Sequence, residues 1–208
     1  MKYKFYSFRN AEVILNQPHF INQFKELCDI IDSISEDELI AAHNSYGLVD
    51  KERTPKSISV SINKLLKERF LGLGWSVESA IFQDNNYLGD TWRLDFAKQD
   101  ISIEVGFNHS SVIAWNLIKP VLASELNHVE KAIQTQIGVI ITATEELQIK
   151  GGFDPAIGVY EKYLDYLKPL RNLLTSPLLI IGLEAPETFE IEVVQFAARK
   201  KIGVVKMK

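Results

Sequence analysis

The apolar positions of this chain change from helical spacing to strict alternation near residue 75. Before that point, apolar residues recur every three or four positions, which predicts amphipathic helices over 18–34 and 57–70. Gly72-Leu73-Gly74 supplies a stop for the second helix. Ser35 and Glu38 have the spacing of a capping box, so we expect a short helix to begin between the two long ones.

Two alternating runs, residues 92–96 and 101–107, follow a predicted strand over 75–82. Each run has an apolar side and a polar side, which is typical of half-buried strands. Lys98-Gln99 is the expected turn between them. In such a hairpin, Asp95 and Glu104 both point away from the apolar side and can face each other.

The rest of the chain predicts helices that alternate with fully apolar strands, an order typical of a sheet covered on both faces. These elements are a helix over 110–128 bent at Pro120, a strand over 137–141, a helix from Asp154-Pro155 to Pro169, a strand over 178–183 and an edge strand over 189–194. The sequence therefore predicts an α/β fold with a mixed central β-sheet flanked by helices, in one domain over 1–208.

Composition narrows the class of protein without naming a reaction. The chain has 208 residues, of which 46% are hydrophobic, enough for one buried core. Its formal net charge of -4 argues against a generally basic nucleic-acid coat, although a cleft can still be basic. We find no apolar run long enough for a membrane span and no signal peptide, so we expect a cytoplasmic protein. The single Cys28 lies on an apolar helical stripe and is interpreted as a structural thiol.

The acids of the hairpin carry the candidate chemistry. Two carboxylates brought together repel each other unless a cation or a proton lies between them, and hard oxygen ligands suit Mg²⁺. The spacing of Asp95 and Glu104 alone, however, favours two solvent-facing acids on an ordinary hairpin. A small-molecule α/β enzyme using these acids is a further alternative, but the sequence has no glycine-rich phosphate loop and no Ser-His-Asp or metal-ligand histidine arrangement.

At this point the residues resemble a known family, the PD-(D/E)XK nucleases, and within it the BglII, BstYI and BamHI group of type II restriction endonucleases. Asp95 and Glu104 are separated by eight residues, as in the BglII-like members, and they lie in the family's order of helices and strands. The resemblance covers most of the chain. It is carried by residues 8–16, Leu94-Asp95-Phe96, Ile103-Glu104-Val105, the helix after them, 137–141 and 177–182.

The resemblance implies a restriction-endonuclease-like fold and Mg²⁺-dependent hydrolysis of double-stranded DNA at a short palindrome. It implies a homodimer in which each subunit cuts one strand, with a cognate DNA methyltransferase encoded nearby. Asp95, Glu104 and the backbone carbonyl of Val105 would bind the metal. If the enzyme follows its nearest relatives, it would cut around a GATC-centred palindrome and leave a 5′ overhang.

One position departs from the family pattern. The third catalytic position, two residues after the glutamate, is usually Lys, and Gln or Glu in the BglII group, but here it is Gly106. Glycine can neither orient a water nor relay a proton. Glu68 on the preceding helix and Lys98 in the turn are candidates for a replacement, and the substrate's own phosphate or a second metal-bound water is the other possibility. The alternative is a catalytically attenuated DNA-binding or DNA-repair protein of the same fold.

Two segments are candidates for DNA binding. Asn108-His109-Ser110-Ser111 begins the helix after the catalytic strands, where free N–H groups favour a phosphate and Asn and His can reach base edges. For His109, a helix cap is an equal alternative. The loop expected over 145–154 contains Lys150, which can meet a phosphate, although a plain flexible loop is nearly as well supported. His19, His43 and His128 lack paired ligand spacing and are assigned structural roles.

Overall fold

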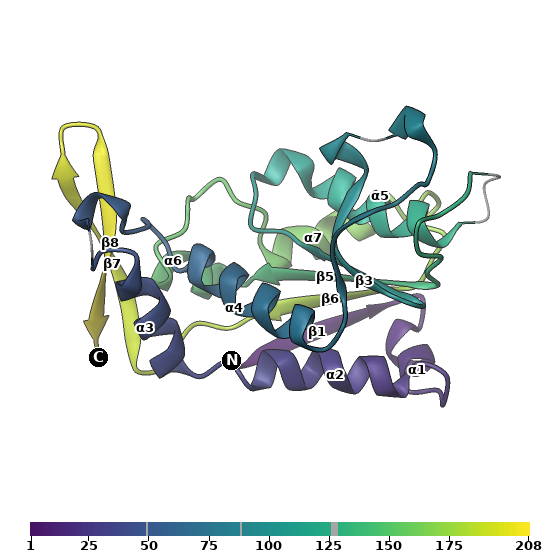
Figure 1. Ribbon diagram of the computed structural model, residues 1–208, viewed down its shortest axis with the longest axis horizontal. Coiled ribbons are helices and arrows are strands. Elements are labelled where there is room, and N and C mark those ends of the chain that lie inside the picture. The colour runs from purple at the N-terminus through teal and green to yellow at the C-terminus, as the bar shows by residue number, and fades with distance from the viewer. Residues whose placement is uncertain (49, 88, 126–128) are drawn as a thin grey trace.

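A mixed six-stranded sheet forms the centre of the molecule (Figure 1). The computed structural model describes residues 1–48, 50–87, 89–125 and 129–208. β4, β5 and β6 are parallel, whereas β1, β2 and β3 are antiparallel to their neighbours. The order across the sheet is β1 (Tyr3–Phe8), β6 (Leu178–Leu183), β5 (Ile137–Ala143), β4 (Ile101–Val105), β3 (Arg93–Lys98) and β2 (Ser76–Ala80).

Helices cover both faces of this sheet, and each face has its own core. Apolar side chains of one set of helices, including α2 and α4, pack with Ile103 and Ile141 on one face. Those of α5 and α7 pack with Ile140 and Ile180 on the other. The α-helices are α1 (Ala11–Leu15), α2 (Ile21–Asp32), α3 (Glu36–Ser45), α4 (Ser59–Gly72), α5 (Ile113–Ser124), α6 (Glu145–Lys150) and α7 (Tyr160–Leu167). Short 3-10 helices cover Lys51–Arg53, Asn85–Tyr87, Asp90–Trp92 and Ser110–Val112.

The structure confirms the predicted α/β class and most of the predicted elements. Every residue of β5 and β6 is buried, as their fully apolar sequences predict. The capping box is also present, since the Ser35 side chain accepts the Glu38 N–H and the Glu38 side chain accepts the Ser35 N–H. No helix in the described ranges is long and apolar enough to cross a membrane.

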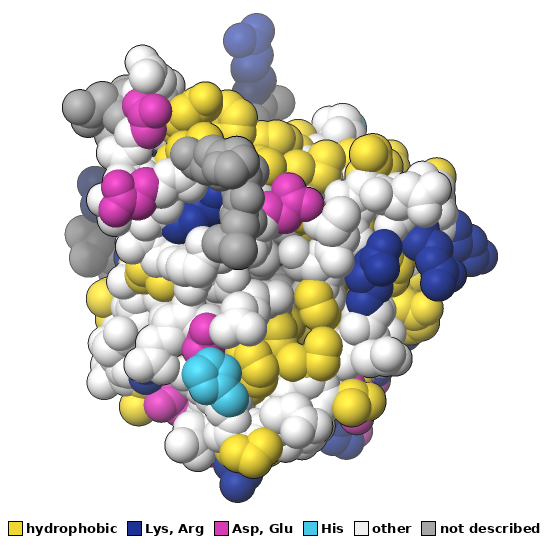
Figure 2. All heavy atoms as spheres, turned by 90° about the vertical axis from the view of Figure 1, so that its right-hand side faces the viewer, with side chains coloured by type: hydrophobic (Ala, Val, Ile, Leu, Met, Phe, Trp, Pro, Cys, Tyr) yellow, Lys and Arg dark blue, Asp and Glu magenta, His cyan; other side chains and the backbone are white. Residues whose placement is uncertain are grey.

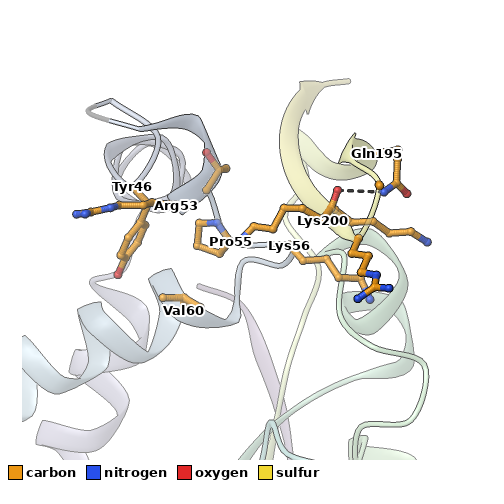
Figure 3. A pocket seen from close by; sticks show the side chains of 11 residues that line it. Tyr46, Arg53, Pro55, Lys56, Val60, Gln195 and Lys200 are labelled. Carbon is orange, nitrogen blue, oxygen red and sulfur yellow. Dashed lines mark hydrogen bonds between the residues drawn. The ribbon is translucent and has the colours of Figure 1, made fainter.

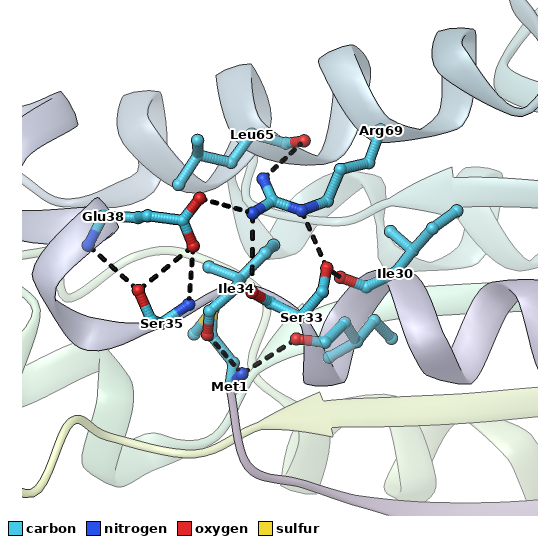
Figure 4. Close-up of polar contacts among 9 residues, drawn as sticks. Met1, Ile30, Ser33, Ile34, Ser35, Glu38, Leu65 and Arg69 are labelled. Atoms are coloured by element: carbon cyan, nitrogen blue, oxygen red, sulfur yellow. Dashed lines mark hydrogen bonds and ion pairs between the residues drawn. The ribbon is translucent and has the colours of Figure 1, made fainter.

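A cluster of polar contacts ties the junction of α2 and α3 to α4 (Figure 4). The N-terminal amine of Met1 donates to the carbonyl oxygens of Ile31 and Ile34, at 2.8 and 2.6 Å. Arg69 of α4 donates to Ser33 Oγ and to a carboxylate oxygen of Glu38, both at 2.8 Å. This cluster fixes the helical layer on one face of the sheet.

Two expectations around the helices were wrong. Residues 145–154 are not one loop, because α6 occupies the first part, capped by Thr144, whose side chain accepts the Leu147 N–H. Asp154-Pro155 does not begin a helix either, since the Asp154 carboxylate accepts the Ala156 N–H in a turn and α7 begins only at Tyr160.

The helix expected over 110–128 is shorter than predicted, because it begins as a 3-10 turn and α5 ends at Ser124. Residues 126–128, His128 included, lie outside the described part of the chain.

The last two strands, β7 (Phe189–Ala197) and β8 (Lys200–Met207), form a separate antiparallel hairpin at one end of the molecule (Figure 1). The predicted strand over 189–194 is therefore present, but it does not lie at the edge of the central sheet. Phe189 and Ile191 join the core beside α6, which holds the hairpin against the body of the protein.

The position of α5 above the sheet depends on a close approach at Gly138 of β5. A Cβ atom at Gly138 would lie 2.4 Å from Cβ of Pro120 in α5 and 2.6 Å from Cδ2 of Leu178. Only glycine therefore lets α5 pack this closely on β5. Lys119, the neighbour of Pro120, is carried toward the sheet by the same contact.

We predict that Gly138→Ala lowers stability by about 1–3 kcal/mol, because the added methyl group overpacks the contact between α5 and β5. For a chain of this size, each kcal/mol corresponds to about 2–4 °C in Tm, which thermal unfolding measures. Gly72→Ala is the matched control, since a Cβ there meets no atom within 4 Å. Equal Tm values for the two variants would contradict the proposed packing constraint.

Candidate active site

The hairpin of β3 and β4 brings the two predicted acids together. Its register pairs Phe96 with Ile103 and Lys98 with Ile101, and continuing this register puts Asp95 opposite Glu104. The turn lies at Gln99 and Asp100, one residue later than predicted, with Gln99 in the left-handed region at φ 47°. The alternation of the two runs was thus sufficient to place both acids.

Asp95 is held against the backbone of the neighbouring strand. Its Oδ2 accepts the Val105 N–H at 2.6 Å, so the carboxylate lies beside the residue whose carbonyl is the expected third metal ligand. Burial raises the pKa of Asp95, and the hydrogen bond from Val105 opposes part of that rise. This carboxylate is therefore positioned before any ligand arrives.

Glu104 is almost completely buried, at 2% exposure. One carboxylate oxygen, Oε1, is bonded to the Nζ atom of Lys119 from α5. The other, Oε2, is buried and has no hydrogen-bond partner among the described residues. Burial, followed by the negative charge of Asp95, raises the pKa of Glu104 to about 8, although Lys119 acts in the opposite direction.

These features fit a divalent cation. A buried carboxylate oxygen without a hydrogen-bond partner lowers the stability of the folded protein. The raised pKa values of the two neighbouring carboxylates indicate that too little positive charge lies near them to neutralise both. No group of three or more His, Cys, Asp or Glu side chains that could hold a metal occurs among the described residues. A cation bound by Asp95 and Glu104 would therefore take its remaining ligands from backbone oxygens, water or substrate, as Mg²⁺ commonly does.

The Tyr163 hydroxyl occupies the space that a side chain at Gly106, directly after β4, would fill. A Cβ atom at Gly106 would lie 2.1 Å from the Tyr163 hydroxyl oxygen. The buried Asn116 of α5 donates to that oxygen at 2.7 Å and to Asn108 Oδ1 at 2.9 Å. Burial raises the pKa of Tyr163, which keeps its hydroxyl neutral. The glycine is therefore required by the packing of α7 against β4.

Neither sequence candidate for the missing third group lies at the acids. Lys98 donates to Glu26 at 2.8 Å and to the Leu73 carbonyl at 2.9 Å. Glu68 is exposed on α4, 4.0 Å from Lys64. In the part of the chain that the structure describes, the cation that contacts the acid pair is Lys119. Its sequence signal was a lone charge within the apolar stretch 117–123, which sequence reasoning passed over.

The candidate DNA-binding residues lie on segments that follow β4 and β5. His109 caps the 3-10 helix at Ser110–Val112, with its Nδ1 accepting the Ser111 N–H at 3.1 Å, so the capping alternative is confirmed. This segment is joined to the turn before α7, because Ser110 N–H donates to the Ala156 carbonyl at 2.7 Å. Lys150 ends α6 and is paired with Glu146.

Comparison with known proteins identifies the family of this chain. Residues 3–183 match the family model described as restriction endonuclease BglII/BglIII, which is most of the chain. The chain belongs to this family. It is therefore a type II restriction endonuclease, a site-specific deoxyribonuclease. No curated protein sequence matches it.

Two solved structures share the fold of this restriction endonuclease. The crystal structure of BglII complexed with a DNA 16-mer matches with a TM-score of 0.67 and 18% sequence identity. The crystal structure of free BglII matches with a TM-score of 0.59 and 20% identity. Each alignment covers 100% of both chains. At this level of identity the likeness establishes the fold.

We predict that Asp95→Asn stabilises the metal-free endonuclease at pH 8. A carboxyl group whose pKa is raised by folding binds more protons in the folded state. Its ionisation therefore costs stability as pH rises from its unfolded pKa, about 4.5 for Glu104, to its folded pKa of about 8. Removing the Asp95 charge relieves this cost, while Asn can still accept the Val105 N–H.

Thermal unfolding in EDTA measures this effect. Asp95→Asn should unfold at a higher temperature than wild type at pH 8, and the difference should shrink at pH 5. The exposed Asp165 of α7 supplies the control, because Asp165→Asn removes the same charge away from Glu104. A lower Tm for Asp95→Asn than for wild type at pH 8 would show that the two acids do not repel each other.

Proposed function

We propose that this restriction endonuclease hydrolyses phosphodiester bonds of double-stranded DNA in a Mg²⁺-dependent reaction at a short palindromic site. The observation that carries the proposal is the buried acid pair, in which Glu104 Oε2 has no partner among the described residues and Asp95 is preset by Val105. Asp95, Glu104 and the carbonyl of Val105 would hold the ion. When bound, Mg²⁺ would polarise the scissile phosphate and lower the pKa of a water nucleophile.

The protein contributes position and charge. The Val105 N–H orients the Asp95 carboxylate, and the surrounding core keeps water from Glu104, which strengthens its interactions with cations. Tyr163, held by Asn116, fills the place of a side chain at Gly106 directly after β4, so no side chain at that position can orient a water. We therefore look to α5 for the group that completes the site.

Lys119 is our candidate for this group. Its ammonium contacts Glu104, and its positive charge opposes the rise in pKa that burial causes in both Glu104 and Asp95. Without metal, Lys119 holds Glu104 in place and partly neutralises it. With metal and DNA present, the same ammonium can stabilise negative charge that develops on the reacting phosphate.

DNA contacts are assigned to Asn108, His109, Ser110, Ser111 and Lys150. Because Nδ1 of His109 is used by the cap, Nε2 is the ring atom that remains for DNA. The ion pair of Lys150 with Glu146 lies at the surface, where such pairs are weak, and can exchange for a phosphate. BglII, whose fold this chain shares, has been crystallised with a DNA 16-mer, which supports duplex DNA as the substrate.

A palindromic site calls for a homodimer, since two-fold symmetry presents one active site to each strand. We propose this assembly, action in the cytoplasm, and a cognate DNA methyltransferase that protects the host site. A GATC-centred palindrome cut with a 5′ overhang is the specific expectation.

We predict that Asp95→Asn and Glu104→Gln each abolish cleavage of plasmid DNA with Mg²⁺ but leave binding to duplex DNA in EDTA measurable. Sequencing the ends produced by wild type tests activity, recognition sequence and stagger together. Asp165→Asn serves as the control and should cut normally. Near wild-type cutting by both site variants would refute the assignment. A wild-type chain that binds DNA but stays inert with both Mg²⁺ and Mn²⁺ would favour the attenuated DNA-binding or repair protein.

Lys119→Met should separate metal binding from chemistry. Removing the ammonium frees Glu104, so Mn²⁺ should bind several-fold more tightly, whereas the single-turnover cleavage rate should fall by about 10²-fold. Calorimetry and rapid-quench kinetics measure the two quantities. Lys119→Arg keeps the charge and should retain more activity than Lys119→Met. Unchanged cleavage by a folded Lys119→Met protein would exclude the proposed role, and Lys162→Met, at an exposed position of α7, controls for charge.

A further inference from the structure

An open cavity of about 750 Å³ lies between the segment that precedes α4 and the tip of the β7–β8 hairpin (Figure 3). Tyr46, Arg53 and Val60 lie on one side, and Gln195 and Lys200 lie on the other. The two walls come from parts of the chain separated by more than a hundred residues. The cavity is distinct from the acid pair, because neither Asp95 nor Glu104 lines it.

The lining of this basic cavity has one sign of charge. It contains five cationic side chains and no acidic one; these are Arg53, Lys56, Arg199, Lys200 and Lys201. Arg199, Lys200 and Lys201 are exposed in and after the turn, and no ion pair involves them among the described residues. The chain as a whole has a net charge of -4, so the charge of this cavity is opposite in sign to that of the whole protein. The other end of the molecule mixes acidic, basic and apolar side chains (Figure 2).

The wall formed by the hairpin is braced in place. Gln195 Nε2 donates to the Lys200 carbonyl at 3.2 Å, across the turn. Gly203 N–H donates to the Pro55 carbonyl at 2.9 Å. Nε2 of the buried His43 forms a hydrogen bond of 2.9 Å with the Gly203 carbonyl oxygen. A Cβ at Gly203 would lie 2.5 Å from the Lys56 carbonyl oxygen, so glycine permits this close contact. The cations are therefore presented by a supported turn.

The basic cavity is connected to the proposed DNA-binding segments. Lys56, which lines it, lies 3.7 Å from Asp154 in an exposed ion pair. Asp154 belongs to the turn whose Ala156 carbonyl accepts the Ser110 N–H. The hairpin also contacts α6, whose last residue is Lys150. One continuous set of contacts thus leads from Asn108–Ser111 to the cavity.

We propose that the basic cavity binds phosphate groups of the DNA backbone outside the recognition sequence, so that the enzyme contacts a longer stretch of duplex. Phosphates are the ligands that clustered Lys and Arg side chains bind without reading bases. Arg53 and Lys56 are paired with Asp50 and Asp154, but both ion pairs are exposed, so a phosphate can replace the carboxylate in each. The inference rests on the proposed function, since it names DNA as the source of the phosphates.

The test compares wild type with R199A/K200A/K201A, which removes three exposed cations of the turn. The control K25A/K162A/K168A removes the same charge from exposed positions of α2, of α7 and directly after α7. Binding is measured in EDTA, across a range of salt concentrations, to duplexes of about 12 and about 30 base pairs that share one central GATC-containing sequence. ATP is the probe for free phosphate.

We expect the turn variant to bind the long duplex ~10-fold or more weakly at low salt, with the salt slope reduced by about 2–3. Its affinity for the short duplex and its Tm should match those of the control. Equal binding of the long duplex by all three proteins would overturn the proposal, as would equal losses on both duplexes or a loss confined to ATP. Because no cleavage is needed, an inert wild-type enzyme would refute the proposed function without deciding this test.

Discussion

The burial of two carboxylates on adjacent strands is the constraint on which the proposed active site depends. Asp95 and Glu104 lie at the rim of a core that is apolar on both faces of the sheet, where ionising either acid is costly. The protein offsets this cost only partly, with the Val105 N–H beside Asp95 and with the Lys119 ammonium and the Asp95 backbone beside Glu104. The remaining deficit of positive charge would favour a divalent cation between the two carboxylates.

Two glycines allow α5 and α7 to approach the part of the sheet that carries this acid pair. Gly138 lets α5 settle on β5, which brings Lys119 within reach of Glu104. Gly106 lets the Tyr163 hydroxyl fill the place of a side chain on β4. A site that lacks the usual third residue on its strand thus obtains a cation from the helix above. The departure seen in the sequence and the lysine found in the structure are two parts of one packing arrangement.

Sequence patterns predicted what depends on local periodicity. Alternation placed Asp95 opposite Glu104, and fully apolar runs identified β5 and β6. Contacts between distant segments were missed. Neither Lys119 nor Tyr163 was predicted to belong to the site, because the partners of both lie on another element. Asp154-Pro155 fits the start of a helix as well as the turn that it forms, and only the bridges from Ile157 and Val159 to neighbouring segments distinguish the two.

Anomalous diffraction from crystals soaked in Mn²⁺ tests whether the buried acid pair is the metal site of this restriction endonuclease. We predict an anomalous peak between the carboxylates of Asp95 and Glu104, close to the carbonyl of Val105. An empty acid pair at saturating Mn²⁺, with Glu104 still bound only to Lys119, would contradict it.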